Sequence, residues 1–415
     1  MPSRNGGSLA LAGVMCVLSW SAFAAETTLE AAIRRTLESN PALQAEGAAL
    51  DARRSQVQLD GLPPALTLGA DLENVAGTGS LSGVHSAEAT LRLGRVIELG
   101  GKRAARQAVG RADVERQQNV VRQRQLDLAA ETTRRYIAVA EGQLELELAS
   151  QQWALTRETE AAVRQRVARG VAPEADQALA QIAVVRAEID REHAEHELAS
   201  AQFALVVLWG ESSPQPIEVT GELLDLPDLP DFTELVARLV DTPEFAAFAL
   251  DGQRLQADRE LARASARPDL SLSVGIRRLE ALDDQGLVLS LAMPFGSATR
   301  SAHAIARNDA EQFELHARQQ AAGLEARQQL FSRYQELRHA RTEFEALSGR
   351  MIPAAEHGLG LTQRGYDDAR YSVLQLTQAQ ATLLQLQLER LNAAARYHQL
   401  LADIERATAS AGVTP

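Results

Sequence analysis

The sequence predicts a mostly α-helical protein that carries four β-strands and is built as a twofold internal repeat. Long proline-free stretches rich in Ala, Gln, Glu, Arg and Leu are typical of helices. Two regions in which apolar and polar residues alternate are typical of β-hairpins. Short motifs recur after about 200 residues, which indicates an internal duplication.

The first 24 residues are expected to form a signal peptide, so that the protein is predicted to be exported. Arg4 precedes an apolar stretch over residues 9–20, and Ala-Phe-Ala at 22–24 has the small-x-small pattern of a cleavage site. Cys16 is the single cysteine and lies in this segment. We therefore expect no disulfide framework, no cysteine-ligated zinc site and no catalytic thiol in the mature protein.

Helical segments define the two predicted repeats, 25–209 and 231–408. A helix over 100–168 would be about 100 Å long at 1.5 Å per residue, so it must lie beside other long helices rather than inside a compact globule. The proline-rich segment 210–230 is predicted to connect the repeats, and 409–415 is a short tail. The helices expected are 28–59, 100–168 and 173–209 in the first repeat, and 232–266, 298–364 (kinked near Pro353) and 371–407 in the second.

Matching motifs support the duplication. Asn-Pro-Ala-Leu at 40–43 parallels Thr-Pro-Glu-Phe at 242–245, and Pro-Ala-Leu-Thr-Leu at 64–68 parallels Pro-Asp-Leu-Ser-Leu at 268–272. Because these pairs keep a nearly constant offset, a duplication explains them better than chance similarity between Ala-rich helices.

Strands are predicted over about 65–76, 86–97, 269–279 and 286–295, where apolar and polar residues alternate. About ten residues is the length of a strand that crosses a bilayer at a tilt. The same alternation fits a hairpin of a soluble protein, so the pattern alone leaves both interpretations open. Four strands cannot close a membrane barrel, whereas three chains would supply twelve.

Composition excludes other classes of protein. The formal net charge of −13 argues against a nucleic-acid-binding protein, which would neutralise phosphates with Lys and Arg. The glycines at 77, 79 and 83 do not have the spacing of a dinucleotide-binding loop, and Gly-Gly-Lys-Arg at 100–103 lacks the other residues of a phosphate loop. We find no catalytic triad or paired-carboxylate pattern, and predict neither an enzyme nor a cofactor.

These features together resemble the TolC family of trimeric outer-membrane efflux proteins, over essentially the whole mature chain. Val-Ile-Glu-Leu-Gly-Gly-Lys-Arg at 96–103 is similar to the branch that serves heavy-metal efflux, the cobalt–zinc–cadmium type. The resemblance implies a homotrimer with a 12-stranded β-barrel in outer-membrane lipid and an α-helical tunnel in the periplasm. It also implies a passive duct that docks onto a periplasmic adaptor (membrane fusion) protein and an inner-membrane RND-type pump.

In this family the periplasmic mouth lies at the two helical turns, which here fall near 169–176 and 366–372. The candidate gate residues by this resemblance are Asp176, Tyr366, Asp367, Asp368, Gln375 and Gln378. Two positions depart from the family pattern. Ala369 replaces the usual glycine, and we expect it to adopt a negative φ in a helical turn. Gln375 and Gln378 stand where the best-known member carries an acidic ring, and Asp367 and Asp368 are candidates to replace that ring.

Alternative interpretations stay open at this point. The chain could be a duct for organic compounds or for protein secretion, or, in a different class, a soluble periplasmic coiled-coil adaptor. His193 and His196 lie three residues apart among acidic residues on one predicted helix, which is a possible metal-binding face but is more typical of a charged helix surface.

Overall fold

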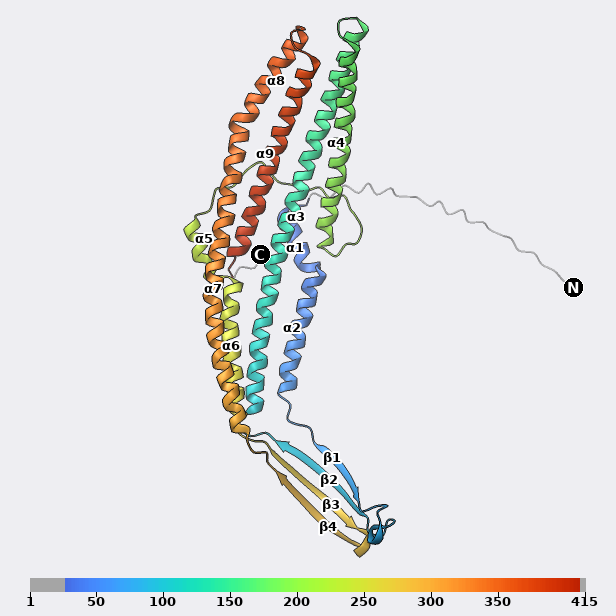
Figure 1. Cartoon of the computed structure of the whole chain (residues 1–415), viewed down its shortest axis with the longest axis vertical. Helices are drawn as coiled ribbons and strands as arrows, with labels where there is room; N and C mark the ends of the chain where they lie inside the picture. The colour runs from blue at the N-terminus through green and yellow to red at the C-terminus, as the bar shows by residue number, and fades with distance from the viewer. Residues whose placement is uncertain (1–26, 411–415) are drawn as a thin grey trace, which may run out of the picture.

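The computed structural model describes residues 27–410, so the predicted signal peptide 1–24 and the end of the tail, 411–415, lie outside the described residues. The molecule is elongated, with long helices along most of its length and a four-stranded sheet at one end (Figure 1). Within residues 27–410, no helix combines the length and the apolar character that a membrane-spanning helix needs.

The elements follow the same order in both repeats. The first contains α1 (Leu29–Ser39), α2 (Pro41–Asp60), β1 (Thr67–Glu73), β2 (Glu88–Ile97), α3 (Lys102–Ala168) and α4 (Glu174–Val207). The second contains α5 (Phe232–Arg238), α6 (Pro243–Ala264), β3 (Leu270–Leu279), β4 (Asp284–Ala292), α7 (Ser297–Ala346), α8 (Ile352–Asp367) and α9 (Val373–Thr408).

The predictions of single helices over 28–59 and 232–266 were wrong, because each helix breaks before a proline. Asn40 (φ −65°, ψ 121°) and Thr242 (φ −77°, ψ 155°) are extended, since a following proline disfavours the helical conformation. The Asn40 side chain accepts hydrogen bonds from the amides of Ala42 (3.0 Å) and Leu43 (3.4 Å), and thereby starts α2. Pro41 and Pro243 each stand in the first turn of the next helix, where a missing N–H costs nothing.

The predicted long helix over 298–364 is also interrupted. A π-helical turn over Leu347–Met351 separates α7 from α8 and ends two residues before Pro353. Proline removes an amide donor and crowds the preceding turn, so the chain locally adopts wider hydrogen bonding in place of a regular α-helix. The kink expected near Pro353 therefore takes the form of a π-bulge.

The four strands form one antiparallel sheet in the order β1-β2-β3-β4. β1 is shorter than the predicted 65–76, because Asn74 (φ 57°) and Ala76 (φ 55°) turn the chain out of the sheet. β4 begins two residues before the predicted 286, directly after the left-handed Asp283. It ends before Pro294, which cannot donate to a strand partner.

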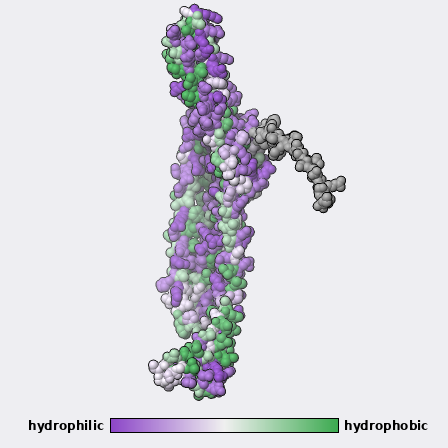
Figure 2. Space-filling view, turned by 90° about the vertical axis from the view of Figure 1, so that its right-hand side faces the viewer, coloured by the Kyte–Doolittle hydropathy of each residue, from purple (hydrophilic) through white to green (hydrophobic). Residues whose placement is uncertain are grey.

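The two faces of the sheet differ in polarity, and the apolar face is the more exposed of the two. One face carries apolar side chains in rows across all four strands, such as Leu68, Leu93, Val274 and Leu289. Leu68 is 72% exposed and Leu289 is 69% exposed, and Figure 2 shows apolar residues gathered at this end of the molecule. Most charged residues lie on the opposite face, namely Asp71, Glu73, Glu88, Arg92, Arg277 and Asp284, whereas Arg95 and Arg278 lie on the apolar face. The outer edges of β1 and β4 have no strand partner among residues 27–410.

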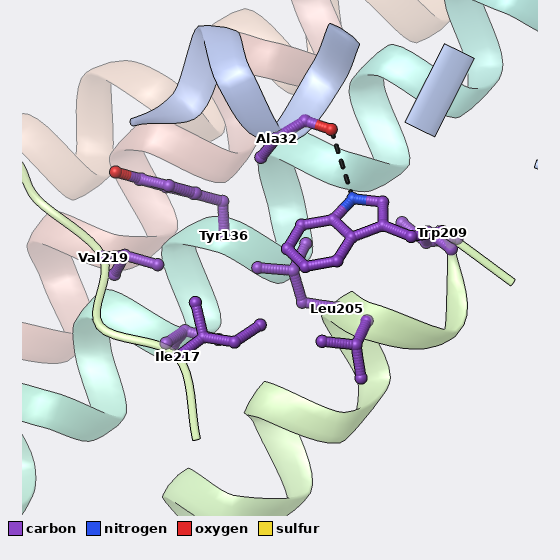
Figure 3. Close-up of a cluster of buried hydrophobic side chains, with 9 residues drawn as sticks. Ala32, Tyr136, Leu205, Trp209, Ile217 and Val219 are labelled. Atoms are coloured by element: carbon purple, nitrogen blue, oxygen red, sulfur yellow. Dashed lines mark hydrogen bonds between the residues drawn. The ribbon is translucent and has the colours of Figure 1, made fainter. Parts of the chain in front are cut away.

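A buried cluster midway along the molecule fastens the connector to the first repeat (Figure 3). The indole Nε1 of Trp209 donates to the carbonyl of Ala32 at 3.2 Å. The Tyr136 hydroxyl donates to the carbonyl of Thr27 at 2.9 Å and accepts from the amide of Thr220 at 3.1 Å. These bonds join α1, α3, the end of α4 and the connector, and they fix the connector against the first repeat.

Candidate functional site

The two helical turns lie at the end of the molecule opposite the sheet (Figure 1). In the first turn, Gly170 (φ 74°) follows the end of α3, and its amide donates to the carbonyl of Val167 at 2.8 Å. The amide of Val171 donates to the carbonyl of Arg166 at 3.0 Å. This pair of bonds is the Schellman pattern, in which a left-handed residue satisfies the last carbonyls of a helix.

The second turn repeats this geometry with alanine in the glycine position. The amide of Ala369 donates to Tyr366 O at 3.0 Å, and that of Arg370 donates to Gly365 O at 2.7 Å. Ala369 has φ 57°, so the prediction of a negative φ there was wrong. The Schellman closure requires a left-handed residue whatever its side chain, and an alanine held there is strained by about 1–2 kcal/mol.

Gln375 and Gln378, the candidates at the acidic-ring positions, are used differently. Gln375 forms a capping box with Ser372: its Oε1 accepts from the amide of Ser372 at 2.9 Å, and the Ser372 hydroxyl accepts from the amide of Gln375 at 3.4 Å. Gln378 is exposed on the next turn of α9. The structure therefore gives Gln375 a part in starting α9.

Tyr366 is the best-anchored candidate. It is 5% exposed and packs with Val163, Val373 and Leu376, so that α3, α8 and α9 meet around its ring. The guanidinium of Arg166 lies 4.6 Å from the centre of this ring, and Arg166 Nη1 donates to the carbonyl of Tyr366 at 2.9 Å. This double contact links the end of α3 to the end of α8.

The three candidate carboxylates belong to the same two turns as the contact between Arg166 and Tyr366. Burial raises the pKa of the Tyr366 hydroxyl, the positive charge of Arg166 opposes that shift, and the negative charges of Asp176 and Asp367 add to it. Asp176 is half-buried in the first turn of α4, where the helix dipole favours a negative charge. Asp367 and Asp368 are exposed, and Asp368 pairs with Arg370 at 2.7 Å. The structure thus brings Asp176 and Asp367 near Tyr366.

Sequence reasoning did not identify Arg166 or the buried pair Thr159 and Gln380. The Gln380 Nε2 donates to Thr159 Oγ1 at 3.2 Å and forms a second polar link between the two hairpins. Only long-range packing brings these residues together, since the contacts join positions about 200 residues apart.

No group of three or more His, Cys, Asp or Glu side chains within residues 27–410 is arranged to hold a metal ion. His196 lies 3.8 Å from Glu192 one turn away on α4, and both side chains are exposed. This pair has the geometry of a surface helix contact, which contributes little.

Two long helical hairpins packed side by side, with a four-stranded sheet at the far end, resemble the architecture of TolC-like outer-membrane channels. Residues 32–211 match the family described as outer membrane efflux protein. The predicted fold class, mostly helical with antiparallel strands, and the predicted resemblance to these channels are therefore confirmed.

The individual relatives agree with this class. The cobalt-zinc-cadmium resistance protein CzcC of Cupriavidus metallidurans is 27% identical over 383 residues, which cover 91% of this chain and 89% of that protein. The solved structure of CusC superposes with a TM-score of 0.75 at 15% identity, over 99% of each chain. The MtrE outer membrane channel of Neisseria gonorrhoeae superposes with a TM-score of 0.72 at 20% identity, over 92% of this chain and 88% of that one. These relatives, outer-membrane channels by name, agree with the predicted location in the outer membrane with an extension into the periplasm.

The two turns provide a reciprocal test of backbone strain. Replacing Ala369→Gly should stabilise the second turn by about 1 kcal/mol, and Gly170→Ala should destabilise the first by a similar amount. A Cβ at Gly170 would meet no other atom within 4 Å, so the backbone alone decides its effect. Hydrogen exchange of the amides that close each turn measures both changes. Unchanged protection in both variants would contradict the conclusion that backbone strain at positions 170 and 369 controls the stability of the turns.

Proposed function

We propose that this protein is the outer-membrane duct of a tripartite efflux system and that it conducts heavy-metal cations passively to the exterior. The observation that carries the proposal is the likeness to CzcC over nine-tenths of the chain. A duct needs no catalytic residues and no cofactor, and the energy would come from its partners. Those partners are a periplasmic adaptor protein and an inner-membrane RND-type pump.

The working unit of this proposal is a homotrimer. Its first support is the sheet, because four strands with open outer edges on β1 and β4 are too few to close a membrane barrel. Three copies would join β4 of one chain to β1 of the next and complete twelve strands. The apolar face would then contact outer-membrane lipid, and the charged face would line the water-filled interior.

The helices provide the second support for the trimer. On α4, buried Ala180, Ala187 and Ala194 repeat every seven residues on one face of the helix. A second stripe on the same helix is exposed and apolar: Leu179, Ile182, Val185 and Ile189. An exposed stripe of this kind indicates an interface with another helix, and a neighbouring copy would cover it while closing the tunnel.

The periplasmic gate in this proposal is the pair of helical turns. Arg166 and Tyr366 would hold the two hairpins of one chain together and keep the mouth narrow. Asp176, Asp367 and Asp368 would supply negative charge there, which raises the local concentration of cations. Gln375 and Gln378 contribute no charge to the mouth.

The alternatives predict different phenotypes. A duct for organic compounds or for protein secretion would have the same fold, so only transport can separate it from a metal duct. A soluble periplasmic adaptor is disfavoured, because the superposition on outer-membrane channels covers nearly the whole chain, including both hairpins of the sheet.

Deletion of the gene tests the proposed function. We expect the deletion strain to lose tolerance to zinc, cobalt or cadmium salts, and complementation to restore it. The growth panel should also contain nickel, copper and several organic toxicants. Sensitivity to organic toxicants alone would contradict metal efflux, and unchanged growth on every compound would contradict efflux as such.

Substitution of Arg166 tests the gate. Arg166→Met removes a charged hydrogen bond and a cation–π contact, together worth about 2 kcal/mol, and should shift the mouth toward open states by roughly 30-fold. We expect a larger single-channel conductance in planar bilayers. Arg164→Met is the matched control, since Arg164 pairs within its own helix with Glu160. Equal conductance in both variants would remove Arg166 from the gate.

A further inference from the structure

One guanidinium bridges two facing carboxylates on the charged side of the sheet. Glu73 of β1 and Glu88 of β2 are directly opposite each other in the register, an arrangement of like charges that destabilises a sheet. Arg277 of β3 contacts both: its Nη1 lies 2.9 Å from Glu88 Oε2, and its Nη2 lies 3.3 Å from Glu73 Oε2. Its Nε donates to Thr90 Oγ1 at 3.0 Å, which fixes the plane of the fork.

The surroundings of this bridge are acidic. The register continues from Glu88 through Leu279 to Asp284 of β4, so a third carboxylate belongs to the same row and the same face. The remaining charged residues of this face are Asp71 and Arg92, which pair with each other. Carboxylates therefore outnumber guanidinium groups at this end of the sheet, and Arg277 offsets only part of the negative charge of the row.

We propose that Arg277 is a specificity-determining residue, a tethered counter-cation that prevents Glu73 and Glu88 from trapping divalent metal ions as they leave the duct. This inference rests on the proposed function, in which the charged face lines the interior. Two facing carboxylates are suitable oxygen ligands for a divalent cation. A guanidinium fixed between them occupies those oxygens permanently, because it does not lose its proton.

The consequence is that the sheet end of the duct attracts cations without retaining them. Surplus negative charge concentrates cations, while a permanently occupied carboxylate pair offers no tight site. Conduction requires this balance, because an ion that binds tightly within a pore blocks the ions that follow.

Arg278, the next residue along β3, provides a matched control. It belongs to the opposite face of the sheet, and it pairs with Glu280 at 3.2 Å and with Asp283 at 2.6 Å beyond the strand end. Arg277→Gln and Arg278→Gln thus remove the same charge from the same strand, but from opposite faces.

The experiment is block of single-channel current by cadmium ions, measured on the full-length protein purified in detergent and inserted into planar bilayers. In Arg277→Gln we expect half-block at a cadmium concentration about tenfold lower than in the unaltered protein. Arg278→Gln should behave as the unaltered protein does. The double variant Glu73→Gln/Arg277→Gln, which removes one of the two ligands, should lose the added sensitivity.

The outcomes separate this inference from the proposed function. If the unaltered protein forms no conducting pores, the duct itself is contradicted. If the pores conduct, but cadmium half-blocks the Arg277→Gln variant at the same concentration as the unaltered protein, the proposed role of Arg277 is wrong. Should Arg277→Gln fail to assemble, Arg277→Lys replaces it, because a single ammonium cannot span both carboxylates. The cadmium concentration for half-block should then lie between that of the unaltered protein and the tenfold lower value expected for Arg277→Gln. A concentration equal to that of the unaltered protein would overturn the proposed role of Arg277.

Discussion

The constraint on which the rest of the structure depends is a four-stranded sheet with an exposed apolar face. Among residues 27–410, β1 and β4 have no strand partner along their outer edges, so the backbone groups there are open to pairing. The apolar face presents side chains such as Leu68 and Leu289 that are about seven-tenths exposed. A sheet of this kind is a template for pairing with further strands, and it suits lipid better than water. The long helices and the exposed apolar stripe on α4 agree with the proposed homotrimer, in which copies of the chain surround a central channel.

The two halves of the chain provide two versions of each part, as the predicted duplication requires. Both repeats place a short helix, a hairpin and a helical turn in the same order, and both turns close with the same hydrogen bonds around Gly170 and Ala369. Their differences are informative. The first repeat contributes Arg166 and the second contributes Tyr366 to one link between the two hairpins.

Local patterns made much of the fold predictable from sequence. Alternation located the four strands, and proline-free stretches located the long helices. The breaks at Asn40 and Thr242 were missed although their signal is local: a residue before proline resists the helical conformation, and either residue type can cap a helix. The capping box of Ser372 and Gln375 is a similar local signal. The left-handed Ala369 was not predictable from its side chain, because the turn imposes the conformation. The contact of Arg166 with Tyr366 depends on packing between distant segments and has no local signature.

The most direct test of the account is whether β1 and β4 of different chains join. Cys16 is the only cysteine and lies within the predicted signal peptide, so one engineered cysteine in β1 and one in β4 can be cross-linked without interference. The account predicts cross-links between chains that yield covalent trimers from detergent-extracted outer membranes. A protein that stays monomeric in buffer without detergent, and forms no cross-links between chains, would contradict it.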